Sequence, residues 1–95
     1  MILTTDLRKK IADSWFSYLQ NQICKEFEFL ENDKMKFKRR DWRKEKIKEG
    51  GGTSYLMLGG KIFEKVGVNK STVSGKFAKQ FRSKIFGAGK DGNYW

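Results

Sequence analysis

The stretch that decides the fold runs from Gly50 to Val68 and reads GGGTSYLMLGGKIFEKVGV. Two segments rich in strand-forming residues, 53–58 and 61–68, flank the pair Gly59-Gly60. A glycine pair between two extended segments is typical of a tight hairpin turn, because glycine tolerates positive φ angles. The sequence therefore predicts an antiparallel hairpin with a two-residue turn at these glycines.

The glycines of this stretch do not fit a phosphate-binding loop. Such a loop needs a Gly-Lys-Ser/Thr step that opens a helix. Here Gly52-Thr53-Ser54 opens a strand, and Gly60-Lys61-Ile62 departs from the pattern in the same way. We therefore interpret the glycines as punctuation of strands.

Upstream of the hairpin, residues 6–31 are predicted to form one long helix, because apolar residues recur at steps of three or four. Thr5 is placed to cap its start, and Asn32-Asp33 is a plausible end. The polar face carries acidic as well as basic residues, which favours packing in a core over binding to a membrane surface. The apolar stripe consists of Leu7, Ile11, Trp15, Leu19, Ile23, Phe27 and Leu30.

Composition limits the chemistry that is open to the chain. It has 95 residues, a net charge of +10, 15% aromatic residues and no histidine. This length indicates one small domain, and the aromatic content argues against disorder. Without histidine there is no imidazole base, no Ser-His or Cys-His pair and no imidazole metal ligand. Cys24 is the single cysteine, so we expect a small buried apolar residue and no disulfide or thiolate cluster.

Residues 34–49 form a strongly basic segment, with nine Lys or Arg against three acidic residues. Because Phe37 and Trp42 interrupt the charges, one hypothesis is a nucleic-acid contact through phosphates and stacked bases. No helix-turn-helix, zinc finger or RNA-recognition signature accompanies the charge. We prefer a solvated connector to a nucleic-acid partner.

Two further patterns concern the end of the chain and its location. Residues 76–85 are predicted to form a short helix with Phe77, Phe81 and Ile85 on one side. The longest wholly apolar run is Tyr55 to Leu58, which is far too short for a signal peptide or a membrane-spanning helix. We therefore expect a cytoplasmic protein and no membrane partner.

A set of spaced motifs is more specific than any of these patterns. Asp41-Trp42 is followed by Gly50-Gly51-Gly52, by the string FEKVGVN at residues 63–69, and by Ser71 and Gly75. This series resembles the aerobic coproporphyrinogen III oxidases of haem biosynthesis, over residues 10–95. The chain departs from the family in two places. It lacks the usual proline, whose place falls near 47–48, and it has Thr-Val-Ser-Gly at 72–75 where many members have His-Val-His-Gly.

The resemblance implies a fold and an activity. The fold is of the α+β class, with a long amino-terminal helix followed by antiparallel strands, as a fragment of a larger helix-flanked antiparallel sheet. Family members oxidatively decarboxylate two propionates of coproporphyrinogen III to give protoporphyrinogen IX. They use molecular oxygen as co-substrate, and neither haem nor flavin.

The resemblance also implies that the chain alone is inactive. It covers only the amino-terminal part of the family enzyme, and the family's functional residues would follow Trp95. No catalytic, substrate-binding or metal-binding residue is therefore assigned. A complementary carboxy-terminal polypeptide is the partner that we expect to restore activity.

One family feature does fall inside the chain. Family members are homodimers, and the resemblance assigns the dimer interface to the predicted hairpin. The alternatives are that these residues face the monomer's own core, or that the chain is an oligomerisation module. The segment consists of Leu56, Met57, Leu58, Gly59, Gly60, Lys61, Ile62, Phe63, Glu64 and Lys65.

Overall fold

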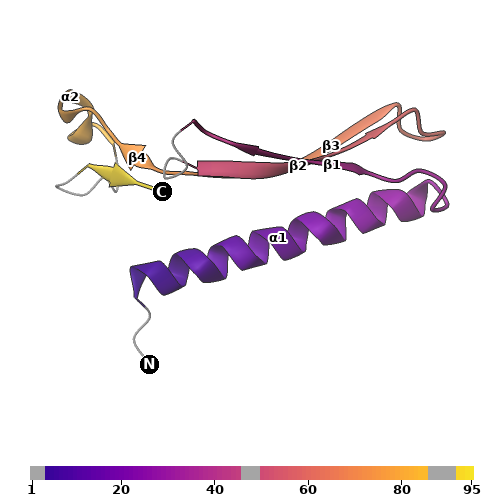
Figure 1. Ribbon diagram of the computed structural model, residues 1–95, viewed down its shortest axis with the longest axis horizontal. Helices are drawn as coiled ribbons and strands as arrows, with labels where there is room; N and C mark the ends of the chain where they lie inside the picture. Colours follow the sequence, from indigo (N-terminus) through magenta and orange to yellow (C-terminus); the bar gives the residue numbers. More distant parts are fainter. Residues whose placement is uncertain (1–3, 46–49, 86–91) are drawn as a thin grey trace.

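The computed structural model describes residues 4–45, 50–85 and 92–95, and it confirms the α+β class. The long helix α1 (Thr5–Leu30) lies along one face of a three-stranded antiparallel sheet (Figure 1). The sheet is a meander in the order β1-β2-β3. Its strands are β1 (Lys38–Arg43), β2 (Gly50–Leu58) and β3 (Lys65–Val73).

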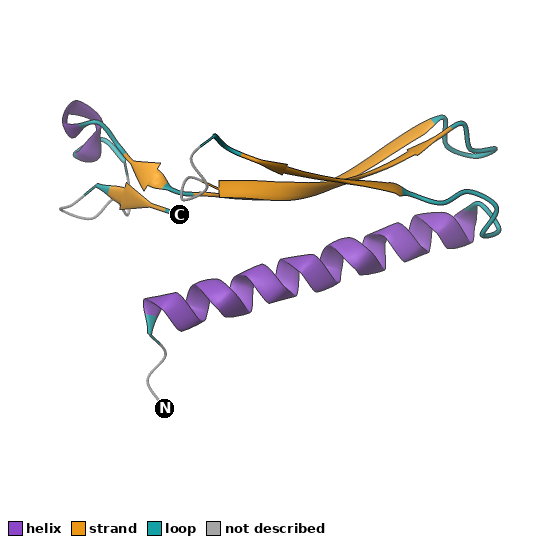
Figure 2. Ribbon diagram, viewed as in Figure 1, coloured by secondary structure: helices purple, strands orange, loops and turns teal. Residues whose placement is uncertain are grey.

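A smaller unit follows the meander and lies beyond one end of the sheet (Figure 2). Strands β4 (Gly75–Lys76) and β5 (Asn93–Tyr94) pair with each other, and the single-turn helix α2 (Lys79–Arg82) lies between them in sequence. The helix predicted over 76–85 is therefore too long, because its first residues pair with β5. The ring of Phe77 packs on Tyr94, with centroids 4.6 Å apart, instead of lying on a helix face.

Both ends of α1 are set by local backbone geometry. The predicted cap Thr5 is wrong by one residue. Thr4 has an extended backbone, and its hydroxyl accepts a hydrogen bond of 3.1 Å from the Leu7 N–H. At the other end Asn32 and Asp33 both have φ of 57°, so the helix cannot continue, as the sequence predicted.

The side of α1 that faces the sheet is not the predicted apolar stripe. A neighbouring face of the helix, offset from the stripe by about one residue, contacts the sheet or is buried. Most residues on this face are polar or small. Six of the seven stripe residues are exposed, and only Phe27 is partly covered. Apart from Phe27, the stripe therefore packs in no core within the described residues, and the prediction of core packing is wrong for most of it. The sheet-facing line consists of Asp13, Gln20, Cys24, Phe27 and Glu31.

The hairpin between β2 and β3 is confirmed, but its two-residue turn is wrong. Leu58 pairs with Lys65, so the connection has the six residues 59–64. The Gly59 N–H donates to the Glu64 carbonyl at 2.9 Å, and Gly59 has φ of +69°. Only Gly59 of the pair uses glycine's conformational freedom, and the loop is wider than a glycine pair suggests.

Glycines 50–52 form the start of the central strand, which agrees with the rejection of a phosphate loop. A Cβ on Gly51 would collide with the Trp42 carbonyl, and one on Gly52 would collide with the Lys70 carbonyl and the Trp42 indole. Neighbouring strands thus approach β2 too closely for any side chain.

The predicted basic connector contains a strand. Residues 38–43 pair along β2, with Lys38 opposite Leu56 and Trp42 opposite Gly52. Pairing to a neighbouring strand outweighs the unfavourable charge and low strand propensity of this segment. The rest of the predicted connector includes residues 46–49, which lie outside the described residues.

Candidate functional site

The segment from Leu56 to Lys65 divides into an inner and an outer set of side chains. Met57 is completely buried, and the Phe63 ring packs edge-on against Phe27 of α1 at a centroid distance of 5.1 Å. Leu58 and Ile62 are 55% and 61% exposed. The inner set therefore belongs to the core between α1 and the sheet, while Leu58 and Ile62 expose apolar side chains near the tip of the hairpin.

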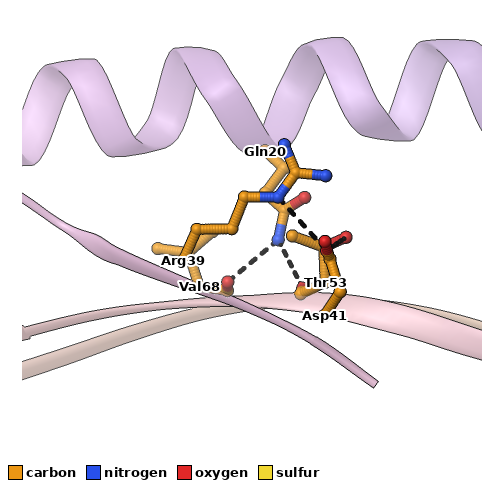
Figure 3. A network of polar contacts seen from close by, with 5 residues as sticks. All are labelled: Gln20, Arg39, Asp41, Thr53 and Val68. Carbon is orange, nitrogen blue, oxygen red and sulfur yellow. Dashed lines mark hydrogen bonds and ion pairs between the residues drawn. The ribbon is translucent and has the colours of Figure 1, made fainter. Parts of the chain in front are cut away.

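The helix is attached to the sheet by a buried amide. Figure 3 shows Gln20 reaching from α1 to the sheet, where its amide donates to the carbonyls of Thr53 and Val68 at 2.8 and 3.0 Å. One side chain thus ties α1 to both β2 and β3. Its burial gives these bonds more weight than bonds at the surface.

A second tie is ionic. The Lys70 ammonium lies 2.7 Å from the Asp13 carboxylate, and the Thr72 hydroxyl donates to the same carboxylate oxygen at 3.2 Å. The hydrogen bond from Lys70 is the main cause that lowers the pKa of Asp13 below its ordinary value, against a partial loss of hydration. Asp13 is therefore a charged group that holds α1 to β3.

The basic residues of β1 are partly engaged within the sheet. Arg39 donates to Asp41 at 3.1 Å, and the Thr53 hydroxyl donates to the same carboxylate oxygen at 2.8 Å (Figure 3). These hydrogen bonds, the one from Thr53 first, lower the pKa of Asp41. Lys38, Arg40 and Arg43 are exposed. Nothing in this arrangement tests nucleic-acid binding, which stays a hypothesis.

Two cavities border the contact between α1 and the sheet. The first, of about 420 Å³, lies between α1 and β3 and has a largely apolar wall. The second, of about 530 Å³, lies beside the glycine run and is lined by Arg39, Asp41, Arg43 and Lys70 among others. The first cavity is lined in part by Phe16, Leu19, Ile23, Val68, Val73 and Trp95.

The sheet face turned away from α1 carries a polar row that sequence patterns alone did not reveal. Lys70 contacts α1, so its neighbour Asn69 points to the opposite face. The register places Asn69 opposite Ser54, and Ser54 opposite Arg40, across all three strands. We call Arg40, Ser54 and Asn69 the outer row. The twofold alternation of strands could have suggested it, but only with β1 and its register known.

Metal-ligating side chains lie dispersed in the described part of the chain. Within residues 4–45, 50–85 and 92–95 no three His, Cys, Asp or Glu residues gather as a metal site. Cys24 is buried as predicted, and burial is the main cause that raises the pKa of its thiol, which makes it unreactive. No helix in these ranges is long and apolar enough to cross a membrane.

Comparison with known proteins identifies the family. The sequence profile described as coproporphyrinogen III oxidase matches residues 11–93. The chain is 42% identical over 95 residues to the oxygen-dependent coproporphyrinogen-III oxidase of Rickettsia felis, with 92% of the chain and 33% of that protein covered. The protein of the same name from Rickettsia typhi is 41% identical over 96 residues, with the same coverage. No solved structure matches the chain significantly. The chain thus spans about a third of the length of the curated relatives it matches, and over nearly all of its own length it belongs to the coproporphyrinogen III oxidase family.

Proposed function

We propose that this chain forms the helix-and-meander portion of an oxygen-dependent coproporphyrinogen-III oxidase. The reaction would be the oxidative decarboxylation of coproporphyrinogen III to protoporphyrinogen IX in haem biosynthesis, in the cytoplasm, with molecular oxygen as co-substrate and no resident cofactor. The observation that carries the proposal is the 42% identity to a relative of that name over 92% of the chain.

The chain alone is proposed to have little or no activity. Its sequence contains no histidine, so it has no side chain whose ordinary pKa lies near neutral pH. Proton transfer to and from a substrate would therefore need groups from elsewhere. We propose that a complementary polypeptide, equivalent to the remaining two thirds of the relatives, supplies them.

The surface of α1 supports a partner of this kind. Six of the seven residues of the apolar stripe are exposed along the helix, including Ile11, Trp15 and Leu30. Exposed apolar surfaces of this extent mark interaction sites. Since the chain covers 33% of its relatives, the remainder of such a protein is the natural occupant.

We further propose that the outer row binds carboxylate groups of the substrate. Arg40 supplies a guanidinium, and Ser54 and Asn69 supply neutral hydrogen-bond donors beside it. A guanidinium binds a carboxylate through paired, charge-assisted hydrogen bonds, and neutral donors complete its coordination. The tetracarboxylate substrate of the relatives' reaction would present such groups to this face of the sheet.

The dimer contact is proposed to involve Leu58 and Ile62 at the hairpin tip. Leu58 ends β2 and Ile62 lies in the connection 59–64; both are exposed apolar residues, and a second copy would present the same pair in a symmetric contact. Met57 and Phe63 would contribute only indirectly, because they pack inside the monomer.

Reconstitution tests the proposal. The chain, the polypeptide equivalent to the rest of the Rickettsia felis protein, and their mixture are assayed for oxygen-dependent turnover of coproporphyrinogen III. We expect turnover from the mixture only. Turnover by the chain alone at the rate of the full-length relative would refute its inactivity, and an inactive mixture would count against complementation.

A further inference from the structure

Strand β3 has one free edge in the described part of the chain. The sheet order is β1-β2-β3, so β3 has a strand neighbour only on the side of β2. The backbone groups on its other side are open to a further strand. An extended segment binds such an edge through main-chain hydrogen bonds, and the pockets beside the edge select its side chains.

The register identifies the backbone groups at this edge. The Gly59 N–H donates to the Glu64 carbonyl, and this bonded pair continues the register of β2 and β3. Bonded pairs recur at every second residue of an antiparallel ladder, so the even-numbered residues of β3 turn their N–H and C=O groups toward β2. The groups of the odd-numbered residues, among them Gly67, Asn69 and Ser71, therefore point to the free edge.

The helix lies over this edge strand and not over the middle of the sheet. The main sheet contact of α1 is with β3, and Lys70 of β3 is the ionic partner of Asp13. A helix with its side chains is about 10 Å wide, and neighbouring strands lie about 4.8 Å apart. The width of α1 therefore also covers the position next to β3 on its free side, where the described residues place no strand.

An apolar groove follows the helix on the same side. The residues that line the cavity of about 420 Å³ come from α1, from β3 and its end, and from Trp95, and they include Phe16. A further cavity of about 340 Å³ continues it along α1, because Leu19 and Ile23 line both. The free backbone groups of β3 and the apolar side of α1 thus border one groove.

We propose that a strand of the complementary polypeptide pairs with the free edge of β3, within the width of α1. This inference rests on the proposed function, and it names the surface through which the two parts join. The chain matches over 92% of its own length but covers only 33% of the Rickettsia felis protein. The other two thirds of such a protein are long enough to supply this strand.

The geometry also sets the side chains of the strand. Lys70 faces α1, so a strand in register beside it turns every second side chain toward α1 and into the groove. These side chains would be apolar, because they pack against Phe16 and Ile23. The alternate side chains lie beside Asn69 and Ser71 on the opposite face, where polar residues fit. The occupant is therefore an extended segment in which apolar and polar residues alternate.

Amide hydrogen exchange tests the pairing directly. It is measured on the full chain alone and with an excess of the polypeptide equivalent to the rest of the Rickettsia felis protein. We expect exchange at Gly67, Asn69 and Ser71 to be fast in the chain alone and to slow about hundredfold in the mixture. The Arg43 amide points to the opposite edge of the sheet, because Lys44 bonds to Gly50, and its exchange should not change.

Proline substitution at the edge separates strand pairing from other contacts. Ser71→Pro removes an N–H that points to the free edge, and proline is tolerated on an edge strand at such a position. We expect the dissociation constant for the complementary polypeptide to rise about tenfold, since a main-chain hydrogen bond is lost. Arg43→Pro makes the same change at the opposite edge and is the matched control, with an effect below about threefold. Calorimetric titration measures both.

A second variant covers the case in which Ser71→Pro does not fold. Phe16 lines the groove and is 53% exposed, so Phe16→Ser should leave the fold intact and weaken binding about tenfold. Phe29→Ser is its control, because Phe29 is an exposed aromatic residue of the same helix that lines neither cavity.

The outcomes separate this inference from the proposed function. A polypeptide that neither binds nor restores turnover overturns complementation, and the inference falls with it. Binding that leaves exchange at Gly67, Asn69 and Ser71 unchanged overturns the inference alone. Slower exchange at these amides when the chain alone is concentrated would assign the edge to a second copy, and this result would also overturn it.

Discussion

At the scale of single residues, Gln20 makes the contact between helix and sheet specific. Replacing it with alanine removes two hydrogen bonds and leaves the carbonyls of Thr53 and Val68 without this donor. We expect Gln20→Ala to lower the free energy of unfolding by about 2 kcal/mol. Urea denaturation measures this, with Asn21→Ala, an exposed amide on the same helix, as control. Equal effects of the two substitutions would contradict the role of Gln20.

Asp13 predicts how stability depends on pH. Its folded-state pKa lies below the ordinary value of 3.8, so its contribution is complete above that value and is lost as the pH falls through the folded pKa. Because the Asp13 side chain is 47% exposed, we expect Asp13→Asn to cost only about 0.5–1 kcal/mol at pH 7. The difference from the wild type should shrink below about pH 4. A difference that stayed constant from pH 7 to pH 2.5 in urea denaturation would exclude the ion pair with Lys70 as its origin.

At the scale of elements, the glycines of the sheet are not equivalent. Gly52→Ala should destabilise the chain by about 2 kcal/mol or more, because its Cβ would collide with the Lys70 carbonyl and the Trp42 indole. Gly67→Ala should be neutral or slightly stabilising, since there is open space at that position and alanine restricts the unfolded chain. Thermal unfolding followed by circular dichroism compares the two. If Gly67→Ala were less stable than Gly52→Ala, β1 and β3 would not approach β2 as closely as described at Gly52.

The start of α1 gives a test that discriminates between two neighbouring threonines. Thr4→Ala should cost about 1 kcal/mol, because the hydroxyl that accepts from the Leu7 N–H is lost. Thr5→Ala should cost nothing or stabilise slightly, since alanine is the better helix former inside the first turn. Urea denaturation measures the free energy of unfolding of both variants. A larger loss for Thr5→Ala than for Thr4→Ala would show that Thr5 is the cap, as the sequence predicted.

The elements that could be predicted from the sequence are those fixed by local patterns. The apolar repeat located α1, and the paired positive φ angles of Asn32 and Asp33 confirm its predicted end. Strand β1 was not predicted, because four of its six residues are basic and have low strand propensity. It forms a strand because it pairs with β2, which is not a local pattern of the sequence. The predicted two-residue turn failed for a similar reason. Glu31, far away in sequence, participates in the shape of the loop.

At the scale of the whole molecule, the chain is open. Its radius of gyration is 17.5 Å, whereas a compact domain of this length has about 12 Å. Cys24 and Met57 are the only buried hydrophobic residues in the described ranges. An arrangement with so small a core has little stability of its own, which agrees with the proposed need for a complementary polypeptide.

The stripe on α1 offers the test at this scale. Trp15→Ser should weaken binding of the complementary polypeptide about tenfold, because it removes a large aromatic contact from the proposed interface. Phe29→Ser is the matched control, since Phe29 is an aromatic residue at least as exposed as Trp15 but lies outside the stripe. Calorimetric titration gives both affinities. If the two variants lost affinity equally, the stripe would not be the binding surface.

The candidate site was only partly accessible from the sequence. The resemblance located the hairpin segment, but not which of its residues face outward, because that depends on the Glu31–Ile62 and Phe27–Phe63 contacts. The apolar stripe was expected in a core, since periodicity shows that a face is apolar and not what covers it. The outer row depends on register between strands, which periodicity does not determine.

The basic residues of β1 have a consequence for aggregation. Within the described sheet, β1 is an edge strand, and an open edge can pair with the same edge of another molecule and start a fibril. Two such edges would bring Lys38, Arg39, Arg40 and Arg43 against the same residues of the neighbour. This repulsion disfavours stacking of copies edge to edge. The basic side chains of β1 thus protect this edge of the sheet against pairing with other copies of the chain.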